Sequence, residues 1–252
     1  MSRDAAGWER MLQSMRTFFA LMPKTSEGGR AVRLDGVVAT VAPAVPERSV
    51  PNSVVYETEE ALADSLEELA QIYEEAGVRA WTVWVPAYHE RAAQLLERAG
   101  HKLDATPTGM IADLDAVEPP RPDDPVVEPF PSSADLGRIN DLAYGTGDAF
   151  QRLLGDRPAD PSHTYLARAD GQAAGSVVSY DHQGDCSIWW VATVPEARGR
   201  GLAAGLLRRA LADGRSRGCD VSTLQATKAG RPVYERLGYR PLGEIQMWER
   251  RR

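Results

Sequence analysis

Glycine and arginine alternate at the point where a predicted strand turns into a predicted helix. The stretch 198–203 reads Arg-Gly-Arg-Gly-Leu-Ala, follows an apolar run and opens a segment with helical periodicity. Gly199 and Gly201 have no side chains, so a ligand can approach the backbone N–H groups closely. At a helix start these groups lack intrahelical partners, and the helix dipole favours negative charge. The stretch therefore predicts a phosphate-binding loop, best suited to a diphosphate, to which Arg198 and Arg200 add positive charge.

The loop does not fit two common nucleotide-binding motifs. A Walker loop would continue with Gly-Lys-Ser or Gly-Lys-Thr, and the dinucleotide fingerprint has three glycines at another spacing. The pattern Arg198-x-x-Gly201-x-Ala203 instead resembles the pyrophosphate loop of the GNAT superfamily of N-acetyltransferases. The phrase "PVYERLGYR" at 232–240 resembles the family's Tyr-Glu-x-x-Gly-Phe/Tyr signature, and the order of strand, loop, long helix and strand before it agrees. The resemblance covers residues 126–252.

The resemblance implies that acetyl-CoA is the co-substrate, and it assigns cofactor-binding roles to two groups of residues. The residues that match the family's pyrophosphate cradle are Arg198, Gly199, Arg200, Gly201, Leu202 and Ala203. Those that match the strand whose backbone pairs with the pantetheine arm are Val191, Ala192 and Thr193. A bulge in that strand would separate it from the next parallel strand.

Tyr234 matches the family tyrosine that commonly faces the acetyl-CoA sulfur. A phenol with an ordinary pKa near 10 remains neutral and can hand a proton to a departing thiolate. We therefore predict a catalytic role for Tyr234; the alternative is an ordinary helix tyrosine packed under the sheet.

The family reaction is attack by a neutral amine on a thioester carbonyl, with a strand N–H of Val191 or a neighbour stabilising the oxyanion. The amine proton needs an acceptor, yet the strand "SIWWVATV" holds no acid. The polar residues that flank this strand are Asp181, His182, Asp185 and Glu196, each of which reads as a solvated turn residue. We select His182 as the candidate base because its unperturbed pKa suits the task. Trp189 and Trp190 are adjacent in the strand and are expected to face opposite sides of the sheet. Core packing is the expected role of both, and the alternative is that one of them lines the acceptor pocket.

The elements that position these residues predict an α+β protein with a mixed sheet and helices on both faces, arranged as tandem GNAT folds. Residues 116–125 hold four prolines and three acids and are the predicted linker between a domain at 1–115 and a catalytic domain at 126–252. A strand is expected to begin at residue 126. Residues 146–163 are expected to form an irregular segment between regular elements. The first 24 residues predict an amphipathic helix with one apolar face, formed by Trp8, Leu12, Met15 and Phe19.

The two halves repeat one another in sequence. Residues 95–102, "LLERAGHK", match 233–240, "VYERLGYR", and the preceding strand and helix patterns align in the same order. In this alignment 57–62, Glu-Thr-Glu-Glu-Ala-Leu, replaces the glycine loop, and Leu96 replaces Tyr234. Lost backbone access and repulsion by three glutamates would exclude CoA. We therefore expect the first half to be a degenerate GNAT-like domain that packs against the second half and walls the acceptor site.

The composition of the chain limits the kinds of partner that it could bind. A net charge of −7 argues against a nucleic-acid-binding surface and suits a cationic amine. The N-terminal stretch is too short in apolar residues for a signal peptide or a membrane span, so we expect no membrane association and a cytoplasmic protein. Cys186 and Cys219 give neither a disulfide framework nor a metal-binding spacing, and we expect no metal.

The sequence as a whole predicts an acetyl-CoA-dependent N-acetyltransferase that acts on a primary amine of a small-molecule acceptor, as a monomer or homodimer. The main alternative is a non-catalytic CoA-binding sensor or regulatory module, with an intact loop but no productive base. A transferase for a longer acyl-CoA is a third interpretation, which a bulky pocket beside the two tryptophans would favour.

Overall fold

The computed structural model describes residues 3–22, 26–128, 131–155 and 162–252. The helices within these residues are α1 (Arg3–Leu21), α2 (Glu59–Glu75), α3 (Glu90–Arg98), α4 (Ser133–Tyr144), α5 (Ala149–Leu154), the short 3₁₀ helix η2 (Pro195–Ala197), α6 (Leu202–Ser216) and α7 (Arg231–Arg236). The strands are β1 (Arg30–Leu34), β2 (Val37–Val41), β3 (Ser53–Tyr56), β4 (Ala80–Pro86), β5 (Lys102–Ala105), β6 (Thr108–Asp113), β7 (His163–Ala169), β8 (Gln172–His182), β9 (Asp185–Thr193), β10 (Val221–Ala226) and β11 (Arg240–Arg251).

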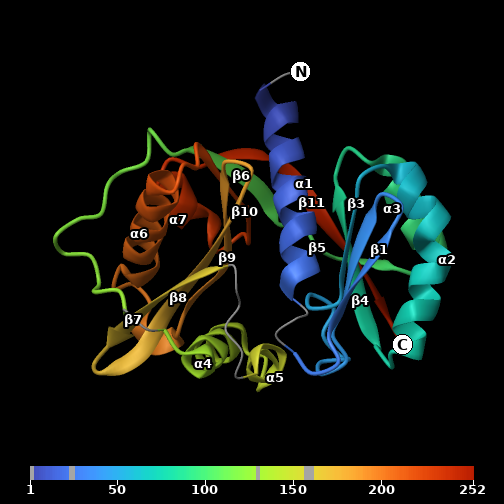
Figure 1. Cartoon of the computed structure of the whole chain (residues 1–252), viewed down its shortest axis with the longest axis horizontal. Helices are drawn as coiled ribbons and strands as arrows, with labels where there is room; N and C mark the ends of the chain where they lie inside the picture. Colours follow the sequence, from blue (N-terminus) through green and yellow to red (C-terminus); the bar gives the residue numbers. More distant parts are fainter. Residues whose placement is uncertain (1–2, 23–25, 129–130, 156–161) are drawn as a thin grey trace.

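These strands form one mixed, 11-stranded sheet that runs through both halves of the chain. Its order is β1-β2-β3-β4-β11-β6-β10-β9-β8-β7, with β5 paired to β11 (Figure 1). Helices α2 and α3 accompany the first half of the sheet, and α4 to α7 accompany the second. The predicted α+β class with a mixed sheet is confirmed.

Helix α1 lies over the middle of the sheet and joins the two halves (Figure 1). Its apolar face recurs every three or four residues, as expected of a helix packed on a core, and buries Trp8, Met11, Met15, Phe18 and Phe19. Its polar groups bond to both sides: the Thr40 hydroxyl of β2 donates to the carbonyl of Phe19 at 2.9 Å, and Ser14 donates to Asp185 of β9 at 2.6 Å. The predicted amphipathic helix is confirmed, and it is shared between the halves.

The last strands of the two halves are exchanged across the predicted linker. Strand β6 pairs antiparallel with β10 over its full length and with Arg240–Glu244 of β11. The rest of β11, Ile245–Arg251, pairs with β4 of the first half. A register shift near Gly243, whose φ is +149°, lets one strand serve both partners. Each half therefore depends on a strand of the other for an internal sheet position.

The stretch 116–125 contains no helix or strand and lies against α6. Asp124 forms a nearly buried ion pair with Arg208, and the pKa of its carboxyl is lowered by that guanidinium. Pro125 packs where a side chain on Gly205 would otherwise stand, since a Cβ there would lie 2.3 Å from the proline ring. The segment after it makes one isolated bridge, Val127 to Ala167, so the strand predicted from 126 is wrong as far as 128, and its end lies outside the described residues. Proline has no N–H group, so a proline-rich stretch offers too few consecutive donors to form a regular β-ladder with a neighbouring strand.

We expect a fragment that begins at residue 120 to be insoluble or unfolded. It lacks β6, the strand between β10 and β11, and it lacks α1, so two core surfaces and two rows of backbone groups would be exposed. Far-ultraviolet circular dichroism and size-exclusion chromatography of the fragment, alone and co-expressed with residues 1–119, would test this. Rescue by the co-expressed chain is expected; a fragment that is folded and fully active alone would refute both this prediction and the walling role of the first half.

Candidate active site

A β-bulge interrupts β9 at Trp190. In the β8–β9 ladder, Val178 pairs with Trp189 and Ser176 pairs with Ala192, so β9 holds one extra residue between them. Trp190 adopts φ +49°, a conformation that is rare for a residue with a large side chain. Both tryptophans consequently contact Phe18 of α1, with ring centroids 4.1 Å and 5.6 Å apart. The prediction that they face opposite sides of the sheet is wrong, because the bulge breaks the alternation.

The parallel neighbours β9 and β10 separate beyond the start of β9. Their ladder contains the single pair Asp185 and Val221, after which the strands diverge. The backbone of Val191, Ala192 and Thr193 therefore follows the bulge at an opening between two strands. The divergence is the one that the sequence analysis expected from a bulge at this place.

The glycine loop lies at the end of this strand and forms a cradle of open backbone. Gly199 and Gly201 adopt φ +77° and +78°, and Gly201 occupies the N-cap position of α6 without any side-chain cap. Apart from the adjacent chain, no atom of the described residues lies within 4 Å of where a Cβ on either glycine would stand. The first N–H groups of α6, at Leu202 and Ala203, have no intrahelical partner and no side-chain cap, and the glycines before them leave open space. Such a helix start is suited to bind phosphate.

The two arginines of the loop reach different partners. Arg198 donates to the carbonyl of Ala143 near the C-terminal end of α4, at 3.0 Å. Arg200 forms an ion pair with Asp170 in the β7–β8 turn, at 2.6 Å, and both side chains are exposed. Exposed pairs of this kind contribute little stability, so Arg200 can exchange its carboxylate for another anion at small cost.

Tyr234 is a buried residue of α7, and burial raises the pKa of its phenol above the ordinary value. A neighbouring phenol, Tyr144, adds to that shift. Tyr144 ends α4 before Gly145, which adopts a left-handed conformation, and its hydroxyl donates to the carbonyl of Val191 at 2.7 Å. Burial of this hydroxyl raises its pKa to about 12, although nearly half of the residue is exposed. Sequence reasoning missed Tyr144, because nothing in its local pattern places α4 against the bulge.

Helix α4 also supports the bulge through a buried hydrogen-bond chain. The amide nitrogen of Asn140 donates to the Ser176 hydroxyl at 3.2 Å, and that hydroxyl donates to the carbonyl of Trp190 at 3.1 Å. Asn140 and Tyr144 are four residues apart and therefore lie on one face of α4. One helix thus holds the bulge through the carbonyls of both Trp190 and Val191.

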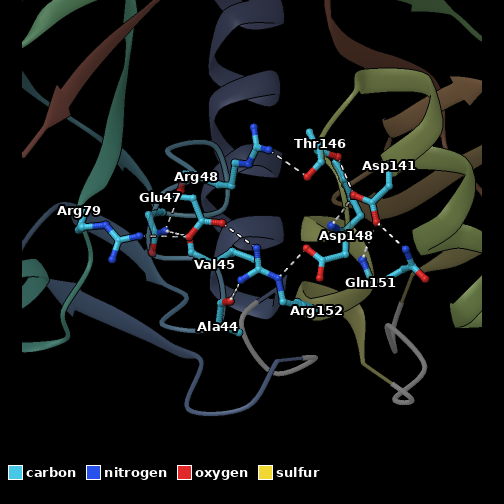
Figure 2. A network of polar contacts seen from close by, with 12 residues as sticks. Ala44, Val45, Glu47, Arg48, Arg79, Asp141, Thr146, Asp148, Gln151 and Arg152 are labelled. Carbon is cyan, nitrogen blue, oxygen red and sulfur yellow. Dashed lines mark hydrogen bonds and ion pairs between the residues drawn. The ribbon is translucent and has the colours of Figure 1, made fainter.

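The first half of the chain fixes the position of α5 (Figure 2). Arg152 of α5 donates to the carbonyl of Ala44 at 2.6 Å and to Glu47 at 2.7 Å, and it also pairs with Asp148 at 3.0 Å. Arg48 donates to the carbonyl of Thr146 at 2.9 Å. These contacts tie the loop before β3 to the α4–α5 hairpin.

The structure does not bring His182 to the bulge. His182 is the last residue of β8 and pairs with Asp185, five residues before Trp190 along β9, or roughly 16 Å at the rise of a strand. Burial lowers the pKa of its imidazole, and the nearby Arg16 lowers it further. Its role as a base remains a prediction without support from this geometry. Of the other flanking acids, Glu196 is exposed in η2 and Asp181 is paired with Arg217.

Asp185 is a buried carboxyl rather than a solvated turn residue, contrary to the sequence analysis. Only 1% of it is exposed, and its Oδ2 accepts from Ser14 at 2.6 Å and from Thr223 at 2.7 Å. Its Oδ1 has no partner in the described structure. Burial outweighs these hydrogen bonds and raises its pKa to about 7. The difference arises because α1 and β10, distant in sequence, close over the start of β9.

We expect Asp185→Asn to change how stability depends on pH. A carboxyl with a raised pKa in the folded protein retains a proton that the unfolded chain releases, so its contribution is complete below about pH 4 and is lost as the pH rises through about 7. Asparagine has no such loss, so the free energy of unfolding of the variant relative to the natural protein should increase by a few kcal/mol from pH 5 to pH 8. Urea titrations at both pH values measure this. A difference that stays constant with pH would show that Asp185 is ionised throughout.

Solved structures of similar fold come from N-acetyltransferases. The chain resembles a GCN5-related N-acetyltransferase from Kribbella flavida, with 16% identity, a TM-score of 0.67 and coverage of 96% of this chain and 94% of that one. It resembles another from Sphaerobacter thermophilus, with 19% identity, a TM-score of 0.56 and coverage of 94% and 91%. A third is a tandem GNAT protein from the clavulanic acid biosynthesis pathway, with 13% identity, a TM-score of 0.53 and coverage of 96% and 95%. No curated protein sequence matches the chain.

A family model matches most of the second half of the chain. Residues 135–239 match the family model described as Acetyltransferase (GNAT) family. This part of the chain belongs to the GNAT acetyltransferase family, and the structural likenesses extend its fold over both halves. Among the described residues, no cluster of three or more acidic, histidine or cysteine side chains could hold a metal ion. The described residues also contain no helix that is both long and apolar enough to cross a bilayer.

Proposed function

We propose that this protein transfers the acetyl group of acetyl-CoA to a primary amine of a small-molecule acceptor. The observation that carries the proposal is the open, uncapped N-terminus of α6 beside a bulged strand that has separated from its parallel neighbour. The residues fit the co-substrate, because the cradle presents free N–H groups and space that any Cβ at Gly199 or Gly201 would narrow.

The chain's own groups have distinct tasks in this reaction. Acetyl-CoA, when bound, supplies an activated acetyl group. The loop Gly199–Ala203 would hold the diphosphate of its CoA part. An N–H of the bulge at Trp190 or Val191 stabilises negative charge on the carbonyl oxygen. The amine nitrogen forms the bond to the carbonyl carbon as the C–S bond breaks; the amine loses a proton to solvent or a base, and Tyr234 Oη gives one to the sulfur.

The first half has features that support its inability to bind CoA. The first turn of α2 is already capped, because Thr58 accepts from the N–H of Ala61 at 3.1 Å. Glu59, in the same turn, accepts from the N–H of Ala92 at 2.8 Å and ties α2 to α3. Leu96, at the position of Tyr234, is fully buried. We propose that this half acts as a support for the acceptor side, through the contacts to α5.

The second candidate function is a CoA-binding sensor. It is favoured by the distance of His182 from the bulge and by the burial of Asp185, which remove these two groups as bases at the transfer point. Titration calorimetry with acetyl-CoA, followed by thiol detection of released CoA across a panel of primary amines, separates the two. Amine-dependent release supports the transferase, whereas tight binding with no release above hydrolysis for any amine supports the sensor.

A further inference from the structure

The two faces of the sheet near the bulge carry different helices, and we expect the donor and the acceptor to approach from opposite faces. A side chain on Gly175 would meet Leu202 and Leu206 of α6, whereas the next residue, Ser176, bonds to Asn140 of α4. Helices α6 and α4 therefore lie on opposite faces of β8. The cradle belongs to α6, so an acceptor that meets a donor held there approaches from the face of α1, α4 and α5.

Three aromatic side chains surround the bulge on that second face, each from a different element. We call Tyr144, Phe150 and Trp190 the aromatic wall. Phe150 of α5 stacks on Tyr144 with ring centroids 5.9 Å apart, and it meets Trp190 edge-on at the same distance. Trp190 and Phe150 are only partly buried and Tyr144 is exposed, in contrast to Phe18 and Trp189 in the core beneath. Partly exposed rings that converge beside a transfer point are typical of a ligand site.

The acids of the α4–α5 hairpin are already engaged. The carboxylate of Asp141 accepts from the Thr146 hydroxyl at 2.6 Å and from the N–H of Phe150 at 2.8 Å, and it also bonds to Gln151. Asp148 is paired with Arg152. A polyamine would need carboxylates for its additional ammonium groups. Asp141 is buried and committed to the fold, and an ammonium group could reach Asp148 only by displacing Arg152.

We propose that the aromatic wall is the acceptor subsite and that the acceptor is a primary amine with an aromatic ring a few bonds from its nitrogen. This rests on the proposed function. The rings stack on or meet the acceptor ring edge-on, and they attract its ammonium group on entry. Their apolar surface then favours the neutral amine, which is the form that attacks.

Calorimetry of the full chain saturated with CoA tests the wall by binding alone. We expect 2-phenylethylamine to bind at least about tenfold more tightly than 1,4-diaminobutane, a difference of roughly 1.4 kcal/mol. Phe150→Leu should weaken 2-phenylethylamine by about five- to tenfold and leave the affinity for acetyl-CoA unchanged. The matched control is Tyr88→Leu, which removes an exposed aromatic of the first half and should change neither affinity.

The outcomes separate this inference from the function on which it rests. Equal or tighter binding of the diamine, or an unchanged affinity in Phe150→Leu, would overturn the wall as acceptor subsite. Selective binding of the aromatic amine without CoA release from any amine would keep the wall and refute the transferase. In turnover, Phe150→Leu is expected to raise KM for 2-phenylethylamine and to leave kcat near its natural value.

Discussion

Gly201→Ala is expected to weaken acetyl-CoA binding by about 100-fold or more, through lost N–H contacts and an unfavourable backbone. The residue has φ +78°, and its missing side chain would point into open space in front of the α6 N-terminus. Since no atom of the described residues outside the adjacent chain lies within 4 Å of the added Cβ, the variant meets no clash with them. The methyl group instead occupies the approach of the diphosphate. Titration calorimetry with acetyl-CoA measures the loss.

Gly77→Ala provides the matched control. Gly77 has φ +69°, no atom within 4 Å of an added Cβ, and a position after α2 in the first half. Both variants carry the cost of a left-handed alanine, about 1–2 kcal/mol, so their thermal stabilities should fall alike. Only Gly201→Ala should lose affinity. If it binds acetyl-CoA within about threefold of the natural protein, a difference near 0.6 kcal/mol, the cradle is not the diphosphate site.

The cradle could be predicted from the sequence because its chemistry is local. Glycine at 199 and 201 before a helical pattern determines the backbone shape and leaves the N–H groups uncapped within a few residues of chain. The same locality explains why α1 and α6 were predicted. In each, one apolar periodicity specifies the element.

The surroundings of the cradle depend on contacts that one local pattern does not contain. Asp185 is buried because Ser14 comes to it from 171 positions away and Thr223 from 38. The direction of Trp190 follows from a bulge that α4 supports through Ser176. The exchange of β6 and β11 joins halves that the sequence divides at its prolines. Tertiary pairing decides all of these, so residues judged by their neighbours in sequence were assigned to solvent or to the wrong face.

Tyr234→Phe is expected to lower kcat by about 100-fold with little change in KM for acetyl-CoA, because one general acid typically contributes 10²–10⁴. The phenol has a pKa raised by burial, so it holds its proton throughout the neutral range. A raised pKa in an acid keeps the active, protonated form at higher pH. The kcat of the natural protein should therefore show no alkaline decrease from this group up to about pH 10.

Tyr144→Phe is the control that assigns the acid, because Tyr144 lies at the bulge and the two phenols are neighbours. The proton of Tyr144 is engaged with the carbonyl of Val191 at 2.7 Å, whereas the described residues offer Tyr234 no such acceptor. Tyr234 can thus release its proton to a ligand without breaking a hydrogen bond within the protein. We expect Tyr144→Phe to cost less than about tenfold in kcat, the value of one neutral hydrogen bond. A larger loss in Tyr144→Phe than in Tyr234→Phe would move the acid to α4, and unchanged kcat in both would mean that solvent protonates the sulfur.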